Sequence, residues 1–334
     1  MKNYLLGCDW GTSSFRLRLI DSSDLQLIDE VTSQEGVAST FNDWKANGES
    51  QGTPRELFFR QQLKRQISLL SSKTAIDLTG IPIVISGMAS SSIGMEEVPY
   101  ATLPFSTDGS FASTKRLSAQ VDFPHTLTLI SGVRTQDDVM RGEETQLIGL
   151  LDLLDTLQVD VDESILIFPG THSKHIYIQQ QQVIDFHTFM TGELFNLMAY
   201  HSILKDSVDP TDLTTFSDDD LTAFTSGIND ADSSVLNDLF KVRTNQLFNK
   251  LTKKQNALYL SGLLIGDELK TLIRQPQWQL ILCSGNNLYE LYKLAMEVLQ
   301  LSDRTTTISA DLIDKATIAG QVKIAQNHLI SMPK

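Results

Sequence analysis

The sequence predicts an α/β protein made of two related domains. Its 334 residues are enough for about two domains of ordinary size. Runs with the period-2 pattern of strands alternate with runs of helical periodicity along the whole chain. The order strand, small-residue tip, strand, turn and strand occurs twice, at 4–31 and at 164–189. Two copies of one unit favour a duplicated domain over a solenoid.

The first copy begins with three short strands at hairpin spacing, at 4–9, 15–21 and 25–31. This spacing predicts an antiparallel meander. The tip between the first two strands reads Gly-Thr-Ser-Ser and directly follows the dipeptide Asp9-Trp10. The tip therefore combines a carboxylate, several hydroxyls and a glycine beside one turn.

The second copy has strands at 164–168 and 183–189, and between them the tip PGTHSK and the return strand HIYIQ. The repeated order leads us to divide the chain into two domains. The N-terminal domain covers 1–145 together with 310–334, so that the last helix returns to it, and the C-terminal domain covers 146–309.

Periodicity and flanking turn residues predict the other elements. The helix at 56–70 places Leu57, Leu63, Ile67 and Leu70 on or near one face. The remaining predictions are a buried strand in IPIVISG that ends in a Gly/Ser-rich loop, a strand at 127–131, a helix from about Glu143, an acidic stretch of loop and short helices at 206–234, helices at 235–251 and 256–273, a strand and a helix around CSGNN, a strand at 305–308 and a helix at 310–329.

The composition excludes several classes of function. The formal net charge is -14, from 41 acidic and 27 basic residues, which disfavours binding to nucleic acid through phosphate neutralisation. The two cysteines, Cys8 and Cys283, lie in apolar runs and predict buried free thiols. No run reaches about 18 apolar residues, and the first residues do not form a signal peptide. We therefore expect a cytoplasmic protein without a membrane partner.

Tips of this kind favour phosphate binding. Successive backbone N–H groups and hydroxyls form a concave nest that holds phosphate oxygens without a lysine. Asp9 could hold Mg²⁺, which prefers oxygen ligands and keeps several waters. Gly-Thr-Ser is also ordinary turn chemistry, but its occurrence twice in the same strand order favours two tips that clamp one triphosphate.

The motifs resemble those of one known family. DWGTSSFR resembles the first phosphate motif of the sugar kinase/actin/heat-shock chaperone ATPase superfamily, PGTHSK the second, and CSGNN the adenosine-side glycine turn. Within that superfamily GMASSSIG, RGEETQLIGLL, PGTHSKHI, FMTGELF and SGNN closely resemble 2-dehydro-3-deoxygalactonokinases. The resemblance implies two ribonuclease H-like domains with an interdomain nucleotide cleft, which is the actin-like ATPase fold. It also implies ATP and Mg²⁺ as cofactors.

The resemblance assigns cofactor contacts residue by residue. Asp9 is the expected metal ligand. Pro169 stands at the second tip, where superfamily members often carry an acid, and the adenosine turn has the single glycine Gly285. The expected nucleotide-binding residues are Gly11, Thr12, Ser13, Arg16, Gly170, Thr171, Ser173, Lys174, Gly285 and Asn286.

Phosphoryl transfer needs a residue that orients the attacking hydroxyl. By resemblance to a GEE run in polyphosphatases, we choose Glu143 as the base, with Glu144 second and Asp9 as a competitor that we assign to the metal. Both glutamates would lie in the first turn of a helix, where acids also serve simply to complement the helix dipole. That alternative stays open.

The substrate implied is a sugar acid, whose carboxylate needs a cation. Arginine donates two parallel hydrogen bonds to a carboxylate, which makes Arg134 and Arg141 candidates. Arg16 and Arg18 alternate along a strand and could both face solvent. The loop that follows the buried strand offers hydroxyls and N–H groups to the sugar, although such loops are often only flexible. Its candidate substrate-binding residues are Gly87, Met88, Ser90 and Ser91.

The function that these expectations favour is ATP-dependent phosphorylation of 2-dehydro-3-deoxy-D-galactonate at its 6-hydroxyl, a step of galactonate catabolism. An exopolyphosphatase or nucleotide hydrolase, or a non-catalytic nucleotide-binding regulator, stays open as an alternative. The histidines His172, His175 and His187 lack the spacing of a zinc site. Sugar stereochemistry and oligomeric state, a homodimer included, are left open by the sequence.

Overall fold

The computed structural model describes residues 3–232 and 234–330, with side chains at all of these positions except 286, 287, 329 and 330. Two compact units make up the chain. The first contains the residues up to Asp160, Gln181–Asp185 and those from Asp311 onward, and the second contains Val161–Gln180 and Phe186–Ala310. The first unit thus continues beyond residue 145, where the sequence-based division ended.

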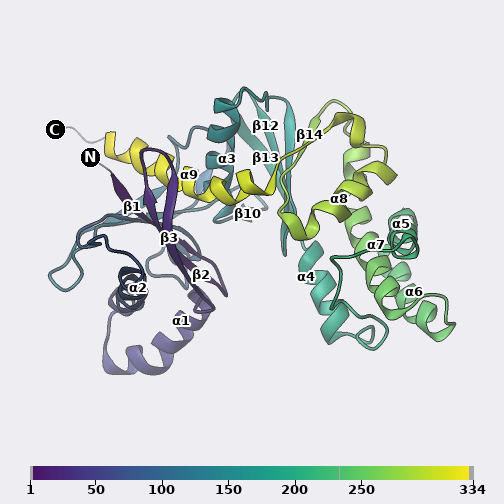
Figure 1. Ribbon diagram of the computed structural model, residues 1–334, viewed down its shortest axis with the longest axis horizontal. Coiled ribbons are helices and arrows are strands. Elements are labelled where there is room, and N and C mark those ends of the chain that lie inside the picture. Colours follow the sequence, from purple (N-terminus) through teal and green to yellow (C-terminus); the bar gives the residue numbers. More distant parts are fainter. Residues whose placement is uncertain (1–2, 233, 331–334) are drawn as a thin grey trace. The chain divides into compact units, whose positions relative to one another are not determined.

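A six-stranded mixed sheet forms the centre of the first unit, in the order β3-β2-β1-β4-β8-β7 (Figure 1). The strand β1 pairs antiparallel with β2 and parallel with β4. Three very short strands form a separate small sheet in the order β10-β9-β5. The bounds are β1 Tyr4–Trp10, β2 Phe15–Asp21, β3 Gln26–Ser33, β4 Ile83–Gly87, β7 Thr114–Leu117 and β8 Leu127–Ile130, and in the small sheet β5 Ala101–Thr102, β9 Val133–Arg134 and β10 Val139–Met140.

The sheet of the second unit follows the order β15-β14-β11-β12-β13. The strand β11 pairs antiparallel with β12 and parallel with β14. The short strand β6 pairs with Gln182 and Val183, the part of β13 that belongs to the first unit. The bounds are β6 Phe105–Ser106, β11 Ser164–Phe168, β12 Ser173–Gln179, β13 Gln182–Phe189, β14 Gln279–Leu282 and β15 Thr305–Thr307.

The two sheets repeat one topology. Each begins with a strand that pairs antiparallel with the next strand in sequence and parallel with a later one. Thus β1 and β11 occupy equivalent places, and so do β2 and β12, and β4 and β14. The predicted meander strands are confirmed, and the shared topology supports a duplicated architecture.

In the first unit α2 (Arg55–Ser71) covers the core that the sheet forms with Trp10 and Phe15. Leu63 and Leu70 of α2 are buried, whereas Leu57 is 41% exposed, so its predicted place on the apolar face was wrong. At about 100° per residue, Leu57 lies roughly 120° round the helix axis from Leu63, and therefore off the buried face. The other helices are α1 Val37–Asp43, α3 Glu143–Thr156 and α9 Ala310–Ile330.

The helices α3 and α9 pack with their backbones in contact. A Cβ added to Gly149 of α3 would lie 1.9 Å from the Ala316 carbonyl oxygen, and one added to Gly320 of α9 would lie 1.8 Å from the Thr145 oxygen. The Gln321 side chain of α9 donates from Nε2 to the Cys8 carbonyl oxygen at 2.9 Å. The yellow helix α9 therefore belongs to the first unit, although it follows the second in sequence (Figure 1).

The second unit is richer in helices, which gather around the long α7 (Figure 1). Within the acidic stretch, the prediction of a loop with short helices was wrong for α5, which has 13 residues. Ser217 and Asp220 form a capping box at its start, and Phe224 and Ile228 pack into the core. The bounds are α4 Thr191–Asn196, α5 Asp218–Asp230, α6 Val235–Leu247, α7 Lys253–Ile273 and α8 Asn286–Val298. None of the described helices combines the length and apolar character needed to cross a bilayer.

Candidate functional site

The first tip joins β1 to β2 and is held by the start of α1. The Gly11 amide donates to the Ser14 carbonyl oxygen at 2.9 Å, which closes the turn. Carbonyl oxygens of Gly11 and Thr12 accept from the amides of Val37 and Ala38 at 2.9 and 3.0 Å. Among the described residues, no hydrogen-bond partner meets the amides of Thr12 and Ser13, which are exposed.

Close backbone contact fixes this arrangement. A Cβ added to Gly36, the residue before α1, would lie 2.3 Å from the Thr12 carbonyl oxygen and 2.5 Å from Ser13 Cα. The Trp10 indole donates to the Glu35 carbonyl oxygen at 3.1 Å and holds the same segment. Only glycine at position 36 lets α1 approach the tip so closely.

The ends of β1, β4 and α3 meet beside Asp9. A Cβ added to Gly87, the last residue of β4, would lie 3.5 Å from Asp9 Oδ1, and one added to Gly142 would lie 3.4 Å from Gly87 Cα. A cavity of about 290 Å³ opens at this meeting point and is lined by Asp9 and Glu143. Its other lining residues are Arg16, Arg18, Arg141, Gly142, Gln146, Ile313, Asp314 and Thr317.

Charges of both signs act on the Asp9 carboxyl in this cavity. Burial raises the pKa of the Asp9 carboxyl, the charges of Arg18 and Arg16 lower it, and the charge of Glu143 raises it further. Arg18 is 6% exposed and pairs with Glu30, with Nε 3.3 Å from Oε2. The alternative that both Arg16 and Arg18 face solvent was therefore wrong for Arg18.

The two glutamates of α3 take different places. Glu143 lines the cavity, and its Oε2 accepts from the Arg141 amide at 2.9 Å. Glu144 is fully buried, and its oxygens accept from the Gly142 amide at 2.6 Å and from the Thr145 hydroxyl at 2.8 Å. Burial raises the pKa of Glu144 to about 7, against the opposing hydrogen bond from Thr145. Glu144 thus supports the turn before α3.

Arg141 stands between the cavity and the Ser-rich loop. Its Nη1 donates to the Ser90 carbonyl oxygen at 2.7 Å and to the Ser90 hydroxyl at 2.5 Å. The guanidinium carbon lies 4.2 Å from the centre of the Tyr100 ring. Its buried Nε has no partner within the described part of the chain. Tyr100 was not selected from the sequence, because a lone tyrosine in a loop carries no signal of stacking.

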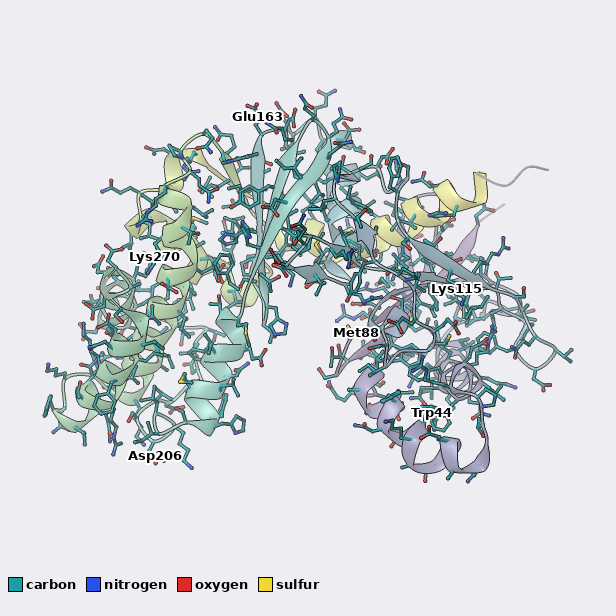
Figure 2. All side chains as sticks on the ribbon, turned by 180° about the vertical axis from the view of Figure 1, so that it is seen from behind. Trp44, Met88, Lys115, Glu163, Asp206 and Lys270 are labelled. Atoms are coloured by element: carbon teal, nitrogen blue, oxygen red, sulfur yellow. The ribbon has the colours of Figure 1, made fainter. Side chains whose placement is uncertain are left out.

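The other substrate candidates are distributed differently. Met88, labelled in Figure 2, begins the loop and packs partly against the core. Ser90 is buried and donates to the Ile130 carbonyl oxygen at 2.7 Å, whereas the buried Ser91 hydroxyl has no partner among the described residues. Arg134 is exposed on β9 and does not belong to the residues that line the cavity with Asp9.

The second tip joins β11 to β12 and is held by the start of α4. The Thr171 carbonyl oxygen accepts from the Glu193 amide at 3.0 Å. A Cβ added to Gly192 would lie 2.6 Å from the Gly170 carbonyl oxygen. The Gly170 amide donates to Ser173 Oγ at 3.3 Å. Amides of Thr171 and His172 have no hydrogen-bond partner in the described ranges.

An apolar cavity of about 260 Å³ adjoins this tip. Gly170 and Thr171 line it on one side, and Leu288 and Leu291 of α8 line it on another. Gly285 directly precedes α8, so the predicted adenosine turn begins the helix that borders the cavity. The predicted contact of Asn286 falls on a side chain outside the described residues. The remaining lining residues are Thr191, Gly192, Phe195, Asn196, Leu213, Ser261, Leu264, Ile265 and Tyr292.

The polar residues of the second tip do not form one cluster. Lys174 is buried in β12 and does not line the apolar cavity. His172 lies with Nε2 2.5 Å from Glu193 Oε2, and His175 with Nε2 3.1 Å from Glu268 Oε1. No group of three or more His, Cys, Asp or Glu that could hold a metal occurs in the part of the chain that the structure describes.

Comparison with known proteins gives concordant matches. The family model of 2-keto-3-deoxy-galactonokinase matches residues 9–324. A 2-dehydro-3-deoxygalactonokinase of Escherichia coli K12 is 32% identical over 71% of this chain and 77% of that protein. A protein of Rhizobium meliloti with the same assigned activity is 30% identical over 80% of this chain and 79% of its own length.

A solved structure agrees with the sequence matches. The crystal structure of a protein assigned as a 2-dehydro-3-deoxygalactonokinase from Sinorhizobium meliloti superimposes with a TM-score of 0.77 at 29% identity, over 99% of this chain and 98% of that one. The predicted α/β class is confirmed: the chain has two mixed sheets, one in each compact unit, and it shares its fold with that kinase structure.

Proposed function

This chain belongs to the 2-keto-3-deoxy-galactonokinase family and is therefore a kinase, and from that premise we propose how its residues phosphorylate 2-dehydro-3-deoxy-D-galactonate at the 6-hydroxyl. One observation carries the proposal. Asp9 and Glu143 line the same cavity, at the ends of β1 and α3. A phosphoryl-transfer centre needs both a carboxylate for the metal and a residue that orients the hydroxyl.

The nucleotide of this kinase is ATP, and both tips contribute to its binding in the proposal. The unpartnered amides of Thr12, Ser13, Thr171 and His172 are the donors that would hold phosphate oxygens. The apolar cavity beside Gly170 suits the adenine and ribose, because cofactor sites are mostly apolar with a few polar groups. We further propose that the two compact units are the two motif-bearing domains.

The residues beside Asp9 fit Mg²⁺. Burial raises the pKa of Asp9, against the charges of Arg18 and Arg16, and the charge of Glu143 raises it further. A cation there would relieve the repulsion between the two carboxylates. A single protein carboxylate is sufficient, because Mg²⁺ takes its other ligands from water and substrate phosphates. When bound, the ion neutralises charge on the phosphates and helps to position the γ-phosphoryl group.

Glu143 is the proposed base. Its carboxylate, in the first turn of α3, accepts the proton of the substrate hydroxyl as the new oxygen–phosphorus bond forms and the bond between the γ-phosphorus and the bridging oxygen of ADP breaks. The hydrogen bond from the Arg141 amide orients the carboxylate at 2.9 Å. Because that bond is local, α3 and the turn before it set the position of the base.

Arg141 is the proposed ligand of the substrate carboxylate. It lines the cavity with Glu143, and its buried Nε lacks a partner in the described part of the protein. Two hydrogen bonds from its Nη1 to Ser90 and the stacking of its guanidinium on the Tyr100 ring hold the group in place. The guanidinium is therefore pre-organised for a planar anion. Gly87, Met88 and Ser91 of the adjoining loop complete the proposed sugar site.

Turnover of ATP with and without 2-keto-3-deoxy sugar acids tests the function. We expect ADP and a phosphorylated sugar acid in equal amounts, with 2-dehydro-3-deoxy-D-galactonate preferred over its C4 epimer. Phosphate release that the sugar acid does not stimulate would instead indicate a hydrolase.

In a second assay, Arg141→Lys should raise KM for the sugar acid by about tenfold or more with little change in KM for ATP. Arg134→Lys serves as the comparison variant.

A further inference from the structure

A buried carboxylate lies beneath the second tip. Glu268 of α7 is 2% exposed, and its partners come from three other elements of the second unit. The Tyr292 hydroxyl of α8 donates to Glu268 Oε2 at 2.8 Å, and the Thr191 hydroxyl of α4 donates to the same oxygen. His175 of β12 lies 3.1 Å from Oε1. Four elements thus meet at one side chain.

The network extends to the tip itself. The Tyr292 hydroxyl lies 3.0 Å from Ser173 Oγ, and Ser173 Oγ accepts the Gly170 amide at 3.3 Å. Tyr292 also lines the apolar cavity proposed for the nucleotide base. A continuous path of hydrogen bonds therefore joins Glu268 to the backbone of the phosphate tip.

The carboxylate sets the direction of every hydrogen bond in this path. The Tyr292 hydroxyl donates to Glu268 Oε2, so its single proton is committed to that oxygen. Ser173 must then donate its proton to the Tyr292 oxygen, and its lone pairs face the Gly170 amide. The Gly170 amide is consequently bound to Ser173, whereas the amides of Thr171 and His172 have no partner in the described ranges and stay available to a ligand.

We propose that Glu268 and Tyr292 are positioning residues, which hold the second tip in the conformation that binds nucleotide phosphates. This inference rests on the proposed nucleotide site and deepens it. Burying a carboxylate costs free energy unless good hydrogen bonds compensate it. A network that only filled the core would be served as well by apolar side chains, whereas one that orients a backbone amide needs donors and acceptors in a fixed order.

The discriminating experiment compares ADP with adenosine, because both use the apolar cavity and only ADP uses the tip. Binding to the full chain is measured by calorimetry. Tyr292→Phe removes one hydroxyl and keeps the ring, so we expect the Kd for ADP to rise about 3- to 10-fold while the Kd for adenosine is unchanged. Ser173→Ala should act similarly, and the double variant should lose less than the product of the two single losses.

Tyr289→Phe is the matched control. It removes a hydroxyl from the same helix, one that bonds the Thr307 hydroxyl at 3.3 Å and does not belong to the network. Its ADP and adenosine affinities should equal those of the unaltered chain. The proposal is overturned if Tyr292→Phe leaves ADP binding unchanged, or if ADP and adenosine weaken by the same factor. Failure of the unaltered chain to bind ADP would overturn the proposed nucleotide site first.

Discussion

The two tips share one backbone arrangement but differ in the side chains beside it. Each joins two antiparallel strands, has two amides without a partner among the described residues, and is held by a helix that begins after the third strand. Gly36 and Gly192 play the same part, since an added Cβ on either would collide with the tip backbone at 2.3 or 2.6 Å. The difference lies in the residue two positions before the tip glycine. It is Asp9 in the first tip and the buried Phe168 in the second.

In the proposed function, this difference separates phosphate binding from phosphoryl transfer. The first tip places a carboxylate in a cavity with Glu143, and the second places a hydroxyl network and an apolar cavity beneath a similar turn. A duplicated unit could therefore keep its phosphate-binding geometry in both copies while only one copy retained the acidic groups. Substitutions in each tip and in the helices that hold them test this division of roles.

The largest expected effect is at Glu143. Glu143→Gln should lower kcat by ~10²- to 10⁴-fold, the scale of general-base removal, and leave affinity for ATP and the sugar acid nearly unchanged. Asp314→Asn is the matched control, because Asp314 is an exposed acid of α9 that lines the same cavity. Steady-state kinetics decide the matter. Equal losses in both variants would show that only the summed negative charge of the cavity counts.

The second largest loss of kcat is expected at Asp9. Asp9→Asn should lower kcat by ~10²- to 10³-fold, because the electrostatic positioning of the phosphates is lost while the shape is kept. The comparison variant is Glu193→Gln at the second tip, where the carboxylate meets His172 and not the reacting group. Its kcat should stay within about threefold of the unaltered value. A large loss at Glu193 together with a small one at Asp9 would reverse the assignment of the two tips.

Glu144 makes a prediction about stability and pH. Its pKa of about 7 in the folded chain exceeds the ordinary value of 4.5, so the folded state keeps a proton that the unfolded state loses. Stability is therefore full below about pH 4.5 and falls as pH rises towards 7, by about 3 kcal/mol from this group. Glu144→Gln should flatten that fall. Denaturant unfolding at pH 5 and pH 8 measures it, and parallel pH profiles in the two proteins would exclude a raised pKa.

The smallest expected effect is at Gly36 and Gly192, where the helices α1 and α4 contact the two tips. Gly36→Ala and Gly192→Ala should each raise KM for ATP by about tenfold, since each would push a helix away from its tip by a few tenths of an ångström or more. Melting temperatures should fall modestly in both. If only one of the two changes KM, the tips do not share the nucleotide, and the equivalence of the two units would hold for topology alone.

Local patterns predicted much of the fold. Alternating residues located β1–β3 and β11–β13 nearly to the residue, because each of these strands is bounded by turn-forming residues. The helix α5 was underestimated, because its acidic first turn looks like loop until Phe224 and Ile228 are seen to pack on α7. Leu57 was misplaced because its spacing of six residues from Leu63 puts the two side chains about 120° apart round the helix.

The candidate site was only partly visible. The tip pattern indicated Asp9, and resemblance of the GEE run indicated Glu143 ahead of Glu144. Only the structure shows that Glu144 is buried and that Glu143 lines the cavity. Tyr292 and Glu268 were not noticed, because a tyrosine and a glutamate within amphipathic helices are typical of ordinary core edges and surfaces. Their partnership depends on contacts between residues far apart in sequence.

The contact between α3 and α9 also has a consequence for protein synthesis. The ribosome makes β1, β4 and α3 early, then the whole second unit, and only afterwards Gly320 and Gln321. Domains generally fold as units in the order of their synthesis, yet here the helix that carries Glu143 lacks its backbone partner until α9 emerges. A growing chain thus completes the second unit, with its proposed nucleotide cavity, before the cavity lined by Asp9 and Glu143 can form. Unfinished chains are expected to hold ATP without consuming it.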